Sequence, residues 1–78
     1  MRVTVYSKRD CGVCTAAKRF LQDRGIRFED VEVGHDSEAL QEMVDRTGGD
    51  QTVPVIVAGD QMVVGFDLDR LKQVFANP

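Results

Sequence analysis

The stretch around the two cysteines constrains the fold of this chain most, because the spacing of apolar residues changes there. Val3 and Val5 alternate with less apolar neighbours, which is the pattern of a strand with one buried face. From Val13 onward, apolar residues recur at helical spacing. Cys11 and Cys14, the only cysteines among the 78 residues, lie at this change of pattern. The sequence therefore predicts two thiols, two residues apart, where a strand leads into a helix.

The rest of the chain continues this alternation of strand and helix patterns, without a repeat, linker or low-complexity stretch. An opening strand–helix–strand unit predicts a parallel pair with a crossover, and a terminal hairpin predicts an antiparallel pair. We therefore expect one α/β domain over residues 1–78, a mixed four-stranded sheet flanked by three helices in the order β-α-β-α-β-β-α. The expected strands are 2–7, 27–33, 53–57 and 61–65, and the expected helices are 12–24, one between Asp36 and Gly48, and one that follows Asp67.

The apolar positions also predict how these elements pack. The nearly unbroken run 53–57 is typical of a strand that is covered on both faces. The alternation slips by one residue between Phe28 and Val31, which suggests a bulge or a bend. The predicted buried stripes are Val13, Ala17, Phe20 and Leu21 in the first helix, Leu40, Met43 and Val44 in the second, and Leu68, Leu71, Val74 and Phe75 in the third.

Size and charge exclude several classes of protein. The length suffices for one small domain. The net charge of −3 argues against nucleic-acid binding, which usually needs a basic stripe. No apolar run approaches the roughly 18 residues of a membrane span, and the chain enters a strand pattern at Arg2 without a signal peptide. We therefore expect a cytoplasmic monomer, in which a cysteine pair is reactive or metal-binding rather than structural.

The position of the cysteine pair predicts different roles for the two thiols. Thiol–disulfide exchange requires a thiolate, and the N-terminal end of a helix favours negative charge. Cys11 stands at that end, with the positive charges of Lys8 and Arg9 on the same loop and the opposing charge of Asp10 beside it. Cys14 lies one turn inward, where we expect burial and a retained proton. Cys11 is therefore the predicted attacking thiol and Cys14 the predicted resolving thiol.

Three motifs in register make the chain resemble the glutaredoxin family, which has the thioredoxin fold. The motifs are Val5-Tyr6-Ser7-Lys8, Thr52-Val53-Pro54 and Val64-Gly65-Phe66-Asp67. They occur around the cysteine pair in the family's order and spacing, and together they span almost the whole chain. The resemblance implies a small dithiol oxidoreductase that reduces protein disulfides or mixed disulfides, with glutathione as its reductant.

The resemblance also assigns contacts with glutathione or substrate to eight residues: Lys8, Gln51, Thr52, Val53, Pro54, Gly65, Phe66 and Asp67. It implies that Lys8 holds the glycyl carboxylate of glutathione and that Asp67, with the neighbouring backbone, holds the γ-glutamyl end. It further implies a cis peptide bond before Pro54, against the cysteines, and a Val53 backbone that pairs with an extended substrate. The structural alternatives are a solvated lysine, a trans proline that begins a strand, and an aspartate that caps a helix, a role that is compatible with glutathione binding.

Departures from the family pattern leave the reductant open. Val13 stands where glutaredoxins often have a tyrosine beside glutathione, Val64 replaces a glycine, and Leu68 replaces a second aspartate. These changes fit the NrdH-type redoxins, which resemble glutaredoxins, take electrons from thioredoxin reductase and supply ribonucleotide reductase. The chain lacks the tryptophan that is characteristic of that group. Glutathione and thioredoxin reductase are therefore alternative sources of electrons.

A metal site is the other class of function for a cysteine pair. Structural zinc usually has four ligands, and His35, alone in an expected exposed loop, is the one further soft ligand. We therefore expect no metal. Some glutaredoxins bind an iron–sulfur cluster between two protomers with glutathione as a co-ligand, and the absence of proline after Cys11 permits this alternative.

Overall fold

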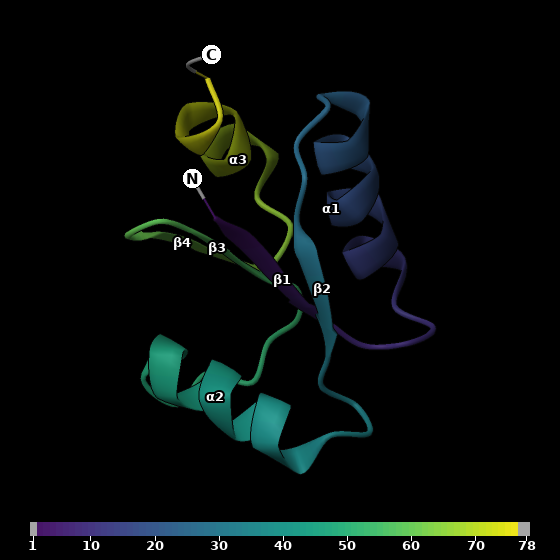
Figure 1. Ribbon diagram of the computed structural model, residues 1–78, viewed down its shortest axis with the longest axis vertical. Helices are drawn as coiled ribbons and strands as arrows, with labels where there is room; N and C mark the ends of the chain where they lie inside the picture. The colour runs from purple at the N-terminus through teal and green to yellow at the C-terminus, as the bar shows by residue number, and fades with distance from the viewer. Residues whose placement is uncertain (1, 77–78) are drawn as a thin grey trace.

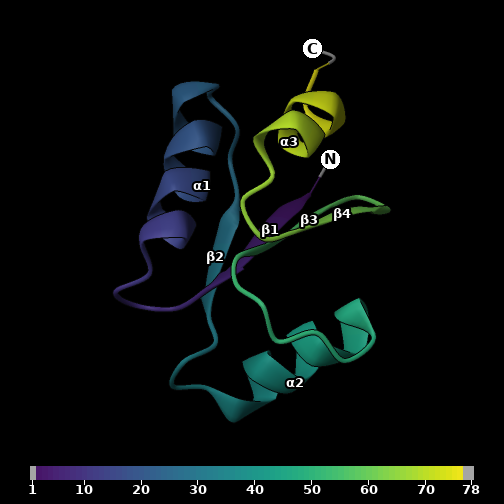
Figure 2. The same cartoon turned by 180° about the vertical axis from the view of Figure 1, so that it is seen from behind.

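The predicted order of strands and helices is confirmed by the computed structural model, which describes residues 2–76 (Figure 1). The strands lie in the order β2-β1-β3-β4, with β1 and β2 parallel and the other neighbouring pairs antiparallel. Helices α1 and α3 cover one face of this mixed sheet and α2 covers the other (Figures 1 and 2). The elements are β1 (Val3–Ser7), α1 (Gly12–Asp23), β2 (Glu29–Glu32), α2 (Ser37–Thr47), β3 (Val55–Ala58), β4 (Gln61–Val64) and α3 (Leu68–Val74).

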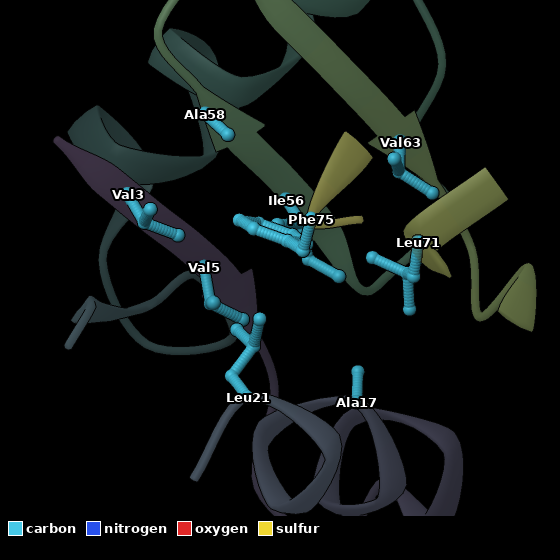
Figure 3. Close-up of a cluster of buried hydrophobic side chains, with 9 residues drawn as sticks. All are labelled: Val3, Val5, Ala17, Leu21, Ile56, Ala58, Val63, Leu71 and Phe75. Atoms are coloured by element: carbon cyan, nitrogen blue, oxygen red, sulfur yellow. The ribbon is translucent and has the colours of Figure 1, made fainter. Parts of the chain in front are cut away.

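Two clusters of buried side chains, one on each face of the sheet, hold the layers together. The cluster between the sheet and helices α1 and α3 consists of Val3, Val5, Ala17, Leu21, Ile56, Ala58, Val63, Leu71 and Phe75 (Figure 3). The cluster that faces α2 consists of Tyr6, Val33, Ala39, Met43 and Val55. In β3, Val55 and Ile56 point to opposite faces and are both almost fully buried. The strand is therefore covered on both faces, as predicted.

The second strand is shorter than predicted and contains no bulge. β2 spans Glu29–Glu32 rather than 27–33, and its residues pair one-to-one with Thr4–Ser7 of β1. The slip in the apolar alternation has a different cause. Phe28 packs on the cluster of α1 and α3, whereas Val31 packs on the cluster of α2. The apolar residues of this segment therefore change from one face of the sheet to the other without an extra residue in the strand.

Two residues that were predicted to lie on buried stripes are exposed. Val13 is 50% exposed. The buried residues of α1 are Cys14, Ala17 and Leu21, and a neighbouring position points about 100° away around the helix. Leu68 is 40% exposed because it lies in the first turn of α3, beyond the end of the core cluster.

Candidate active site

The edge of the sheet at which β1 and β4 end brings the three sequence motifs together. Tyr6, near the end of β1, is opposite Val55 at the start of β3, and Val55 is opposite Val64 at the end of β4. The loop after β1, the loop before β3 and the loop after β4 therefore leave the sheet at the same edge (Figures 1 and 2). These loops carry the cysteine pair, residues 52–54 and residues 65–67.

Cys11 is the N-cap residue of α1. Its backbone is extended, with φ −111° and ψ 108°, and its Sγ accepts a hydrogen bond from the backbone N–H of Cys14 at 3.2 Å. Its carbonyl oxygen accepts hydrogen bonds from the backbone N–H and the hydroxyl of Thr15, both at 3.1 Å. The first N–H groups of a helix have no partner within the helix, and the helix dipole favours negative charge there. The fold directs both effects at the sulfur of Cys11, which is partly exposed.

Cys14 has the opposite environment, because its side chain is completely buried. Burial and a hydrogen bond with the side chain of Cys11 raise the pKa of the Cys14 thiol from 9.0 to about 11. A backbone hydrogen bond from Lys8 and the positive charge of Lys18 act in the other direction but do not outweigh these causes. Cys14 therefore holds its proton at neutral pH. The predicted contrast between an accessible and a buried thiol is present in the structure.

The segment around Pro54 has the predicted cis peptide bond, which joins Val53 to Pro54. Because Pro54 has no N–H, β3 begins at Val55 rather than at the predicted residue 53. The carbonyl oxygen of Pro54 accepts a hydrogen bond from the N–H of Gly65 at 2.7 Å. Gly65 has a φ of 79°, a conformation that favours glycine. The second and third motifs therefore form one hydrogen-bonded unit at the edge where α1 begins.

Asp67 is the N-cap residue of α3, as its position before the helix predicts. Its Oδ1 accepts a hydrogen bond from the backbone N–H of Arg70 at 3.1 Å. Phe66 is 37% exposed, and Gln51 and Thr52 are exposed as well. These side chains are accessible to a ligand at the edge of the sheet, and their assignment to glutathione stays a prediction.

Lys8 lies against the loop between β2 and α2. Its Cγ is 3.5 Å from the position that a Cβ would have on Gly34, and it lines a groove together with Glu32 and His35. None of residues 51–54 or 65–67 lines that groove. His35 is exposed, as predicted, and its Nδ1 and backbone nitrogen each lie 3.0 Å from a carboxylate oxygen of Glu32. These hydrogen bonds lower the pKa of Glu32.

The sequence places this site in a known family. The sequence model of the glutaredoxin family matches residues 3–63. The chain belongs to the glutaredoxin family. The glutaredoxin-like protein NrdH of Escherichia coli K12 is 36% identical over 78 residues, which cover all of this chain and 94% of that protein. A glutaredoxin of Neisseria meningitidis is 40% identical over 73 residues, which cover 91% of this chain and 85% of that protein.

Solved structures of glutaredoxins and redoxins have the same fold. The NrdH-redoxin of Escherichia coli superposes with a TM-score of 0.85 at 36% identity, with complete coverage of both chains. A glutaredoxin of Archaeoglobus fulgidus superposes with a TM-score of 0.86 at 26% identity. The superposition covers 97% of this chain and 87% of that one. The thioredoxin-like fold is therefore confirmed. As a glutaredoxin-family protein with this cysteine pair, the chain is a thiol–disulfide oxidoreductase.

Within residues 2–76, no three His, Cys, Asp or Glu side chains are grouped so that they could hold a metal ion. None of the helices in this range is long and apolar enough to cross a membrane.

One set of polar residues near the cysteine pair was not identified from the sequence. Asp30 accepts hydrogen bonds from Ser7 and Lys18, and Lys18 acts electrostatically on Cys14. The sequence did contain a signal for Lys18, because a residue four positions after Cys14 lies on the same side of the helix. The part played by Asp30 was not readable, because it depends on the register of β2 against β1.

Proposed function

We propose that Cys11 attacks the disulfide of a protein substrate and that Cys14 resolves the mixed disulfide. The contrast between a partly exposed sulfur at a helix N-cap and a buried thiol beside it carries this proposal. The Cys11 thiolate forms a bond with one substrate sulfur, and the other substrate sulfur leaves and takes up a proton. Cys14 then loses its proton and attacks Cys11, which releases the second substrate thiol. Two electrons have moved to the substrate, and Cys11 and Cys14 are joined by a disulfide.

The segment before β3 is the proposed binding site for the substrate backbone. Val53 is only partly buried and precedes the strand without being part of the sheet. An extended substrate can pair with the backbone of Val53, in the manner of an added strand, while its disulfide reaches Cys11. The hydrogen bond from Gly65 to Pro54 supports this role, because it holds the segment before β3 to the loop after β4.

Thioredoxin reductase is the proposed source of electrons for the oxidised pair. The full-length similarity to NrdH of Escherichia coli supports this, because that protein is described as glutaredoxin-like with a thioredoxin-like activity profile. Two features of the site also support it. Position 13 carries a small exposed valine, and an oxygen of Asp67 is already engaged by the start of α3. Ribonucleotide reductase is the proposed electron acceptor, in the cytoplasm.

Glutathione is the second candidate for the reductant. The cis-Pro54 segment, its bond to Gly65 and the nearby Asp67 support it, because they lie at one edge of the sheet as the glutaredoxin motifs require. The 40% identity to a glutaredoxin of Neisseria meningitidis supports it as well.

A coupled assay separates the two reductants. The protein is given insulin as a disulfide substrate and NADPH, together with either thioredoxin reductase alone or glutathione and glutathione reductase. We expect turnover with thioredoxin reductase and little with the glutathione system. Turnover only with the glutathione system would reject the first candidate in favour of the second.

Trapping experiments test the two thiol roles. Cys14→Ser leaves the attacking sulfur in place but removes the resolving one, so the substrate should accumulate on Cys11 as a mixed disulfide that mass spectrometry detects. Cys11→Ser is the matched control and should trap nothing. Trapping by Cys11→Ser instead would reverse the roles.

A further inference from the structure

A polar network beside Cys14 connects β1, β2 and α1. The carboxylate of Asp30 accepts a hydrogen bond from the hydroxyl of Ser7 at 2.8 Å on Oδ1 and one from the ammonium group of Lys18 at 2.9 Å on Oδ2. Ser7 is 2% exposed, and the side chain of Lys18 is 25% exposed. Asp30 is thus fixed by the sheet through one oxygen and holds the lysine of α1 through the other.

The network lies on the side of α1 that carries the buried thiol. Lys18 follows Cys14 by four residues, so the two side chains project from the same side of the helix, one turn apart. Asp30 is opposite Val5 in the pairing of β1 with β2, and Val5 belongs to the cluster that α1 covers. Both views show β2 beside α1 (Figures 1 and 2). Lys18 therefore reaches from α1 to β2 across the flank of the thiol site.

The resolving step needs such a positive charge. Cys14 must become a thiolate to attack, but its side chain is completely buried, so water cannot solvate the negative charge. In the reduced pair, the charged groups that act on Cys14 are Cys11, which opposes ionisation, and Lys18, which favours it. In the mixed disulfide the sulfur of Cys11 is bonded to the substrate and carries no charge, whereas Lys18 keeps its positive charge. Lys18 in turn faces Asp30, which is bonded to Ser7.

We propose that Lys18 stabilises the Cys14 thiolate as it forms in the resolving step, and that Asp30 and Ser7 are positioning residues that hold Lys18 in place. The inference rests on the proposed role of Cys14. A lysine stem has four rotatable bonds and gains entropy by extending into water, so a fixed carboxylate is needed to keep the ammonium group against the helix. In this step Cys14 gives its proton to solvent and bonds to the sulfur of Cys11. The bond from Cys11 to the substrate breaks, and the leaving thiolate takes up a proton.

Reaction of the reduced protein with dithiobis-nitrobenzoate separates the two chemical steps. Attack by Cys11 releases one coloured nitrothiobenzoate, and attack by Cys14 on the mixed disulfide releases the second, so stopped-flow absorbance measures both rates. We expect Lys18→Met to slow the second release by about tenfold and to move its pH profile upward by about one unit, with the first release unchanged. Lys18→Gln should behave in the same way, and Lys18→Arg should restore most of the rate because it retains the charge.

Two further variants test the origin of the effect. Asp30→Asn keeps an acceptor but loses the ion pair, so it should slow the second release less than Lys18→Met does. Arg19→Met removes the same charge from an exposed neighbouring position on α1 and should change neither rate. An unchanged second release in Lys18→Met, or equal slowing by Arg19→Met, would overturn the inference. A wild-type protein without any second release would instead refute the resolving role of Cys14, and with it the inference.

Discussion

The N-terminal ends of α1 and α3 use the same backbone arrangement for different purposes. In α1 the sulfur of Cys11 accepts the N–H of Cys14 at 3.2 Å. In α3 a carboxylate oxygen of Asp67 accepts the N–H of Arg70 at 3.1 Å. A carboxylate is a strong acceptor, whereas sulfur is a weak one, so α1 has the weaker cap. The comparison shows that the fold places a thiol, the proposed nucleophile, at a position where helices usually have a residue that stabilises the helix end.

The residue that donates to the cap also differs between the two helices. Cys14 is completely buried, whereas Arg70 is exposed and its guanidinium donates to Gln61 at 3.1 Å. The third residue of α1 therefore points inward and places a second thiol beside the first. The third residue of α3 points outward and keeps its charge in water. Four predictions sharpen or break this comparison.

The largest effect is expected from Cys11→Ser. Serine is a good N-cap residue but a poor nucleophile in disulfide exchange, so the activity should fall by about a thousandfold or more while the fold is retained. The reductase-coupled assay measures the activity, and circular dichroism measures the thermal midpoint. Residual turnover close to that of the wild type would show that the sulfur at this cap is not the attacking group.

The second effect is a pH-dependent loss of stability in the reduced protein. The pKa of Cys14 is about 11 in the folded state and 9.0 at its usual value, so the folded state holds this proton more tightly. Above pH 9 the unfolded state loses the proton first, and the free energy of unfolding should fall by about 2 kcal/mol by pH 11.

Urea unfolding at pH 8, 9, 10 and 11 checks this prediction, with the oxidised protein as its control. The oxidised form has no thiol to titrate, and Tyr6, whose pKa is also raised, titrates in both forms and cancels in the difference. Parallel loss of stability in the two forms would assign the effect to groups other than the thiols.

The third effect concerns the cap of α3. Asp67→Ala removes the acceptor of the Arg70 N–H, so the free energy of unfolding should fall by about 1 kcal/mol and the thermal midpoint by about 4–8 °C. Asp67→Asn keeps an oxygen acceptor, so its free energy of unfolding should fall by only about a few tenths of a kcal/mol. If both variants lose the same stability, the charge and not the hydrogen bond supports α3. Turnover with thioredoxin reductase should be retained in both variants.

The smallest effect is expected when the glycine near each cap is replaced by alanine. Gly12 follows Cys11, and a Cβ added there meets nothing within 4 Å, so Gly12→Ala should raise the free energy of unfolding by about 0.5 kcal/mol. Gly65 lies two residues before Asp67 with a φ of 79°, so Gly65→Ala should lower it. Thermal melts of the two variants should move in opposite directions. Shifts of the same sign would contradict the expectation that alanine fits the backbone at Gly12 but is strained at Gly65.

The sequence predicted the parts of the fold that depend on local patterns. The change of apolar period at the cysteines, the cap at Asp67 and the stop near Gly48 are all signals within a few residues, and the structure confirms them. The exposure of Val13 was not predicted, because a helical stripe admits several rotations and only packing shows that Cys14 occupies the inner position. Local patterns therefore define the elements better than their orientation.

The parts of the site that depend on contacts between strands were not predictable. Phe28 and Val31 suggested a bulge or a bend, because the sequence does not show that these apolar residues pack on opposite faces of the sheet. The pairing of Asp30 with Lys18 depends on the register of β2 against β1 and on the placement of α1 beside β2. The cis bond at Pro54 was foreseen through the family motif and not through its local composition.

Because Cys14 is completely buried, Cys11 is the one thiol of this protein that a reagent in solution can reach. An alkylating reagent or a peroxide meets Cys11 first, because the second sulfur has no exposed surface. We expect oxidation of Cys11 by peroxide to produce a sulfenic acid, which condenses with the thiol of Cys14 to a disulfide and water before further, irreversible oxidation takes place. On the proposed roles of the two thiols, the buried Cys14 would thus protect Cys11 from irreversible oxidation, because the product is the same disulfide that forms in each catalytic cycle.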